Sequence, residues 1–140
     1  MDATQAHRFY EDCLSTTYVR GQLERLTDYY LPEVTTHYPI PGFPAGIAGV
    51  ELATRSFLAS FSNVDLRMED FTQEGDTFRC KARVEVTHSG EFMGLAPTGR
   101  RVEIVAEHRF RLHGGRIAES WSQADVTHVL RELGASTQAV

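Results

Sequence analysis

The stretch from Val102 to Asp125 constrains the fold most, because it reads as two adjacent strands joined by a tight turn. In the first half of this stretch every second residue is apolar except for one histidine; these residues are Val102, Ile104, Ala106, His108, Phe110 and Leu112. A period of two residues is typical of a strand with one buried face. The turn is His113-Gly114-Gly115-Arg116, where glycine supplies the positive φ angles that two-residue hairpin loops require. The sequence therefore predicts a hairpin with His108 on its buried face.

Pairing His113 with Arg116 sets the expected register, which places Trp121 opposite His108 and Asp125 opposite Ile104. An imidazole, an indole and a carboxylate would then face one apolar space. Desolvation there lowers the pKa of a histidine and raises that of a carboxylic acid, which suits acid–base catalysis. Two structural alternatives stay open. An inward histidine is often only a core residue, and Asp125 is also well placed to cap a helix beginning at Val126.

The rest of the chain predicts helices first and further strands after them, which is an α+β fold. Apolar residues recur at three- and four-residue intervals, as in amphipathic helices, over residues 4–19, 22–30 and 50–61. Strand patterns cover a short segment, an irregular segment with an expected bulge, and a regular segment that ends at His88, over residues 34–38, 65–74 and 77–88. The proline- and glycine-rich loop 39–49 is interpreted either as a lid or as a connector.

Several other side chains are candidates to contact a ligand in such a fold. Phe57 and Phe61 lie on the apolar stripe of the third helix, and His88 ends an apolar strand face. Phe92 belongs to the long loop before the hairpin, and Tyr38 lies at the exit of the early strand. Core packing is the alternative for Phe57 and Phe61, and a surface position is the alternative for Tyr38.

Composition limits the class of protein. A chain of 140 residues fits one domain, 1–140, with residues 134–140 expected to be a flexible tail. The net charge of −5 without a basic stripe argues against nucleic-acid binding. No apolar run reaches the ~20 residues of a membrane span and no signal peptide is evident, so we expect a cytoplasmic protein. Cys13 and Cys80 read as reduced core thiols, and no metal-ligand spacing occurs.

A set of short motifs in the last third of the chain recurs together in one family. They are Gly94, Pro97-Thr98, Gly115-Arg116-Ile117, Glu119, Trp121, Asp125 and the run from Leu130 to Gly134. This segment resembles the SnoaL-like polyketide cyclases of the nuclear-transport-factor-2-like superfamily. The resemblance implies a cone-shaped α+β barrel, in which a curved mixed or antiparallel sheet is wrapped by N-terminal helices around an apolar pocket.

The family's cyclases have a histidine on the penultimate strand and an aspartate on the last strand that are implicated in catalysis. His108 falls on the histidine position. An alignment without a gap puts Ser122 on the aspartate position, and Asp125 matches a second family aspartate three residues later. A regular strand cannot turn both Ser122 and Asp125 inward, so a bulge near Trp121 is needed to bring Ser122 to the pocket.

The resemblance favours intramolecular aldol cyclisation of an aromatic polyketide without a bound cofactor. His108 and Asp125 are then the expected catalytic residues, and Trp121 and Ser122 are expected to contact the substrate. Hydroxylation of a similar polycycle and ligand binding without catalysis are the alternatives. We also expect a homo-oligomer, with a dimer favoured, because one sheet face carries mixed charges that could pair across a two-fold axis, namely Arg79, Lys81, Arg83, Glu103, Glu107, Arg109 and Arg111.

Overall fold

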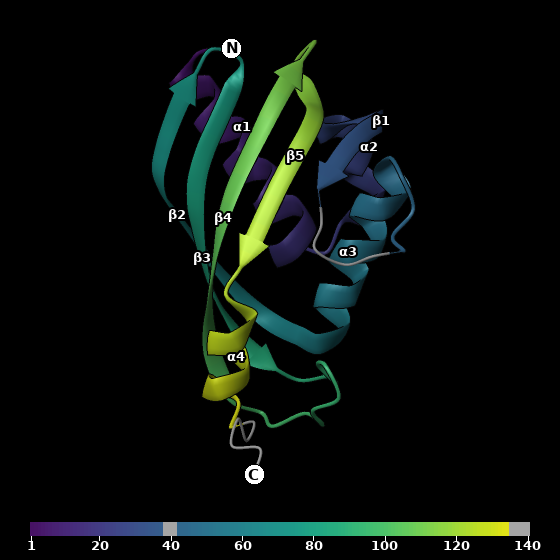
Figure 1. Ribbon diagram of the computed structural model, residues 1–140, viewed down its shortest axis with the longest axis vertical. Helices are drawn as coiled ribbons and strands as arrows, with labels where there is room; N and C mark the ends of the chain where they lie inside the picture. Colours follow the sequence, from purple (N-terminus) through teal and green to yellow (C-terminus); the bar gives the residue numbers. More distant parts are fainter. Residues whose placement is uncertain (38–41, 135–140) are drawn as a thin grey trace.

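The computed structural model describes residues 1–37 and 42–134 (Figure 1). The helical elements before the sheet are α1 (Ala3–Leu14), a π-helical turn η1 (Ser15–Val19), a 3-10 turn η2 (Leu23–Arg25) and α2 (Leu26–Tyr29). The later elements are β1 (Tyr30–His37), α3 (Ile47–Ser60), β2 (Phe61–Glu74), β3 (Thr77–His88), β4 (Arg101–His113), β5 (Arg116–Ala124) and α4 (Val126–Glu132). Tyr38 and residues 135–140 lie outside the described part, so the roles expected of them stay predictions.

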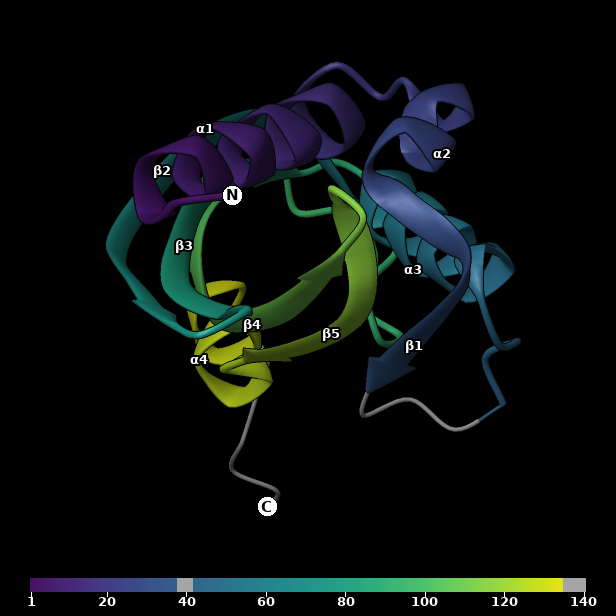
Figure 2. The same cartoon turned by 90° about the horizontal axis from the view of Figure 1, so that it is seen from above.

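The strands form one five-stranded sheet in the order β1-β5-β4-β3-β2. β1 runs parallel to β5, and all other neighbours are antiparallel. Figure 2 shows the sheet curving around α1, with α3 beside β1 and β5. The prediction of an α+β fold with helices before a curved mixed sheet is confirmed.

Helix α1 begins with a capping box in which Asp2 and Gln5 satisfy each other's backbone N–H groups. Its buried face carries Tyr10, whose ring stacks on Phe110 of β4 at a centroid distance of 4.1 Å. This contact anchors α1 to the concave face of the sheet. A second apolar cluster, around Phe61 and Val86, includes Val129 of α4.

The hairpin between β4 and β5 is present, but its register differs from the regular pairing. Leu112 pairs with Ile117 as expected, whereas Arg111 pairs with Glu119, so Ala118 has no partner and forms a bulge. The extra residue reverses which side chains of the rest of β5 lie on each face of the sheet. Ser122, instead of Trp121, consequently lies opposite His108, and the expected pairing of Trp121 with His108 is wrong.

Candidate functional site

An apolar cavity of about 130 Å³ lies between α1, α3 and the concave face of the sheet. Its floor is a row of three small residues in register across β3, β4 and β5, namely Ala82, Ala106 and Ala124. A methyl side chain at each of these positions leaves space that larger residues would fill. Ala124 lines the cavity and is itself exposed, so the cavity opens to solvent on that side.

The row next to these alanines carries the polar groups of the cavity. His108 and Ser122 are directly opposed on β4 and β5, and both line the cavity. Cys80 is the partner of His108 on the other side, on β3, where burial raises the pKa of its thiol to about 12. Cys80 therefore stays a neutral thiol at physiological pH, and the imidazole is the reactive group of the row.

His108 is held by a residue that comes 98 positions earlier in the chain. The Tyr10 hydroxyl oxygen lies 2.7 Å from His108 Nδ1, and the two rings meet edge to face at 5.7 Å. Burial lowers the pKa of His108 from 6.5 to about 4. The imidazole is thus neutral near pH 7, with one nitrogen bound to Tyr10.

The opposite wall of the cavity is aromatic and aliphatic. Tyr18 lies in the π-helical turn η1 and meets Phe57 of α3 edge to face at 5.1 Å. Burial raises the pKa of Tyr18, so its hydroxyl also stays protonated. The other apolar side chains of the lining are Leu14, Leu66, Val84 and Ile104. Among the residues that the structure describes, no carboxylate lines the cavity.

Three of the predicted ligand-contacting residues lie one layer beyond the cavity. Phe61 packs on Phe57 at 5.1 Å and on Phe92 at 5.0 Å. His88 is fully buried beside Phe61, and its Nδ1 accepts a hydrogen bond from the Thr98 N–H at 3.2 Å. Its Nε2 has no partner among the described residues. These side chains therefore pack behind Phe57 and are not part of the cavity lining.

Trp121 lies on the outer face of the sheet instead of in the cavity, because of the bulge at Ala118. Its indole stacks on His37 at 4.9 Å and lies under the Arg109 guanidinium at 3.9 Å. All three residues line an open hollow of about 700 Å³ on the outer face. The expected contact between Trp121 and a ligand in the apolar cavity is therefore not supported by its position.

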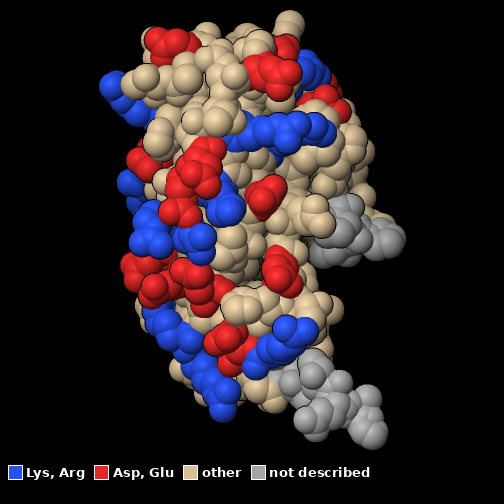
Figure 3. All heavy atoms as spheres, turned by 60° about the vertical axis from the view of Figure 1, so that its left-hand side comes forward, with Lys and Arg blue, Asp and Glu red and all other residues tan. Residues whose placement is uncertain are grey.

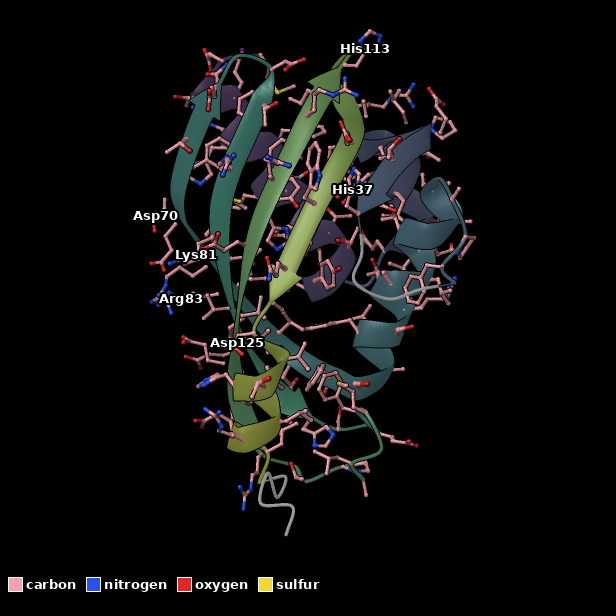
Figure 4. All side chains as sticks on the ribbon, in the orientation of Figure 1. His37, Asp70, Lys81, Arg83, His113 and Asp125 are labelled. Carbon is pink, nitrogen blue, oxygen red and sulfur yellow. The ribbon has the colours of Figure 1, made fainter. Side chains whose placement is uncertain are left out.

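Asp125 occupies the junction of β5 and α4, where Figure 4 labels it. Its carboxylate accepts a hydrogen bond from the His128 N–H at 3.0 Å, so it caps α4 as the alternative interpretation predicted. It is exposed and does not line the cavity. The expected pairing with Ile104 is also wrong, since the Asp125 N–H is directed to the Val105 carbonyl.

Sequence reasoning missed Tyr10 and the alanine row. Tyr10 was visible only as one apolar position of an amphipathic helix, because nothing local ties it to His108. Each alanine occupies an inward strand position in the alternation, and their alignment follows only from the strand pairing. Within residues 1–37 and 42–134 no cluster of metal-binding side chains occurs, and no helix is long and apolar enough to cross a membrane.

A curved five-stranded sheet with N-terminal helices and an inward histidine defines a nuclear-transport-factor-2-like fold, here with an apolar cavity. The model of the SnoaL-like polyketide cyclases matches residues 4–133, and the chain belongs to that family. The comparison with curated proteins gave no match.

Solved structures agree with this assignment. TsrD from Streptomyces laurentii is 25% identical with a TM-score of 0.85, covering 97% of this chain and 99% of TsrD. IdmH from Streptomyces antibioticus, a candidate polyketide cyclase, is 28% identical with a TM-score of 0.80, and the match covers 96% of this chain and 99% of IdmH. AclR from Streptomyces galilaeus, a candidate hydroxylase, is 20% identical with a TM-score of 0.82. The match covers 99% of this chain and 87% of AclR, and it shows the shared fold.

Proposed function

We propose that this protein is an enzyme that closes a ring of an aromatic polyketide by intramolecular aldol addition. The observation that supports this most is a neutral imidazole, His108, facing an apolar cavity. A neutral imidazole can stabilise the charge that develops on a carbonyl oxygen when a carbon–carbon bond forms. The likeness to IdmH, at 28% identity, supports the same class of reaction.

The size of the cavity limits how a substrate enters. A dry cavity of about 150 Å³ holds one benzene molecule, so about 130 Å³ accommodates a single ring. We therefore expect the reacting ring to lie over the alanine row, beside His108. The remaining rings would extend towards Ala124, where the cavity opens.

The chemistry needs an enolate carbon, a receiving carbonyl and a proton for the oxygen formed. Water takes the proton from the α carbon, and the resulting enolate carbon bonds to the carbonyl carbon. The carbonyl π electrons move to oxygen, and that oxygen takes a proton back from water, so that ring closure is an isomerisation. His108 hydrogen-bonds this oxygen, and the Ser122 hydroxyl orients the substrate. One well-placed hydrogen-bond donor to a developing oxyanion contributes about 10²–10³ in rate. Asp125 receives no step in this scheme, because its carboxylate caps α4 outside the cavity.

Oxygen insertion into a similar ring system is the second candidate function. It is favoured by one observation, which is that the described cavity lining has no carboxylate to remove a proton from carbon. Dioxygen would be the oxidant, with one oxygen atom entering the ring and the other leaving as water. The two electrons would come from the electron-rich substrate itself, without a metal, or from a partner reductase. Ligand binding without turnover is the third candidate.

Product mass separates these functions. The protein is incubated with the methyl ester of an uncyclised aromatic polyketide, and the products are analysed by mass spectrometry. Isomerisation or loss of water supports cyclisation, a gain of one oxygen atom supports hydroxylation, and binding without conversion contradicts both. His108→Ala should lower turnover by about 10²–10³-fold if the imidazole acts as described.

A matched pair of substitutions tests whether the cavity is the binding site. Ala106→Leu places a larger side chain on the cavity floor and should abolish ligand binding. Ala48→Leu makes the same change at an exposed position of α3 and should leave binding unchanged. Equal binding by the two variants would place the ligand elsewhere.

We also expect two copies of the chain to pair through the outer face of the sheet, where Figure 3 shows acidic and basic side chains interspersed. Arg79 is paired with Arg109 near one end of β3 and β4, and Glu85 is paired with Glu103 near the other. A two-fold axis running across the strands would bring the basic end of one copy onto the acidic end of the other. Sedimentation equilibrium of the wild type and of Arg79→Glu, at low and high salt, tests this. A wild type that sediments as a monomer at low salt would contradict it.

A further inference from the structure

The hydrogen bond between Tyr10 and His108 joins two groups that can each donate or accept. The hydroxyl oxygen and Nδ1 are 2.7 Å apart, which is a short distance for this type of bond. The Tyr10 ring is fixed by stacking on Phe110 at 4.1 Å with an interplanar angle of 20°. The hydroxyl is thus aimed at Nδ1 by the packing of α1 on β4.

The chemistry of the two groups decides which one donates. A phenol O–H is a stronger acid than the N–H of a neutral imidazole, and an imidazole nitrogen is a stronger base than a phenol oxygen. The favoured arrangement is therefore O–H donated by Tyr10 to Nδ1. A neutral imidazole carries one proton, which must then reside on Nε2.

The position of Nε2 gives this proton a function. The two ring nitrogens point away from each other, so Nε2 faces away from Tyr10. His108 lines the cavity, and Nε2 has no hydrogen-bond partner in the part of the chain that the structure describes. The groups around it that could titrate or donate are the Cys80 thiol on β3 and the Ser122 hydroxyl on β5.

We propose that Tyr10 is a positioning residue that fixes the tautomer of His108, so that Nε2–H is presented to the cavity as a hydrogen-bond donor for a ligand oxygen. The preferred ligand atom is then a carbonyl, enolate or phenolate oxygen, and His108 does not remove a proton from substrate carbon. This inference rests on the proposed function only for the identity of the ligand atom that His108 contacts. The tautomer itself is a property of the protein without substrate.

Nitrogen-15 NMR of the labelled protein at neutral pH reads the tautomer directly. His108→Gln assigns the His108 signals by their loss. In the wild type we expect a protonated Nε2 and an unprotonated Nδ1 whose resonance is shifted by the hydrogen bond. Tyr10→Phe keeps the stacking on Phe110 and should move the Nδ1 resonance towards that of a free imidazole. A proton on Nδ1 in the wild type, or an unchanged spectrum in Tyr10→Phe, overturns the proposal.

A matched control separates this role from general packing. Tyr29 is also buried, and its hydroxyl contacts Thr16 and Asp12 instead of His108. Tyr29→Phe should therefore leave the His108 signals unchanged. If it alters them as much as Tyr10→Phe does, the effect is structural and the positioning role is wrong.

Three ring probes of similar size test the donor in the cavity. Pyridine offers only an acceptor, pyrrole offers only a donor, and benzene offers neither. We expect the wild type to bind pyridine about three- to tenfold more tightly than benzene, which is the range for one net hydrogen bond, and to bind pyrrole no more tightly than benzene. Preference for pyrrole overturns the proposal. Failure of all three probes to bind, together with the predicted NMR result, would contradict the cavity as the binding site and leave the tautomer assignment standing.

Discussion

Replacing His108 with glutamine should remove part of the acid sensitivity of the fold. Burial lowers the pKa of the folded His108 to about 4, whereas the unfolded chain has the ordinary value of 6.5. Between these values the unfolded state binds the proton and the folded state does not, so the free energy of unfolding falls as the pH falls from 6.5 towards 4. At pH 5 the expected loss, relative to neutral pH, is at most about 2 kcal/mol.

The assay is urea denaturation at a series of pH values from about 7 to 5. We expect the free energy of unfolding of the wild type to fall by up to about 2 kcal/mol more over this range than that of His108→Gln, because the variant lacks the desolvated imidazole. His113→Gln is the control, since His113 is exposed in the hairpin turn and should behave like the wild type. Parallel pH profiles for the wild type and His108→Gln would refute the argument that burial keeps this imidazole neutral.

Three further changes have definite expected outcomes. Asp125→Ala should lower stability by about 1 kcal/mol in thermal or chemical unfolding by removing the cap of α4, while Asp125→Ser keeps most of it and neither alters ligand binding in the cavity. Gly90→Ala should destabilise by about 1–3 kcal/mol or more in the same assays, because its Cβ would lie 1.8 Å from the Ala59 carbonyl oxygen. Arg109→Ala should shift the fluorescence emission of Trp121, the single tryptophan, to longer wavelength, because it removes the guanidinium that covers the indole at 3.9 Å. An unchanged emission spectrum would contradict the stacking.

Local patterns predicted the elements well. The alternation over residues 77–88 and 102–112 matches β3 and β4 to within a residue, because each strand has one face in the core. The stripe of residues 50–61 corresponds to α3, which begins three residues earlier at Ile47. Asp125 was also recognised as a cap from its place before an amphipathic segment. These features depend on neighbours in sequence, which a pattern can report.

Features that depend on distant partners were missed. β1 begins at Tyr30 instead of residue 34, because parallel pairing with Ile117 extends the strand through Pro32. The bulge at Ala118 leaves no mark in the amino-acid pattern, so the residue that faces His108 was misidentified. Sequence alone could state that a bulge was needed to turn Ser122 inward, but only the strand pairing locates it.

The row of small side chains under the cavity has an evolutionary consequence. Ala82, Ala106 and Ala124 come from separate strands, and codons for alanine and valine differ by one nucleotide. A point mutation at any of them would trim the available space on a different side while leaving the imidazole in place. Descendants of this gene can therefore change which molecules they accept in small, independent steps, without rebuilding the scaffold that carries the reactive group.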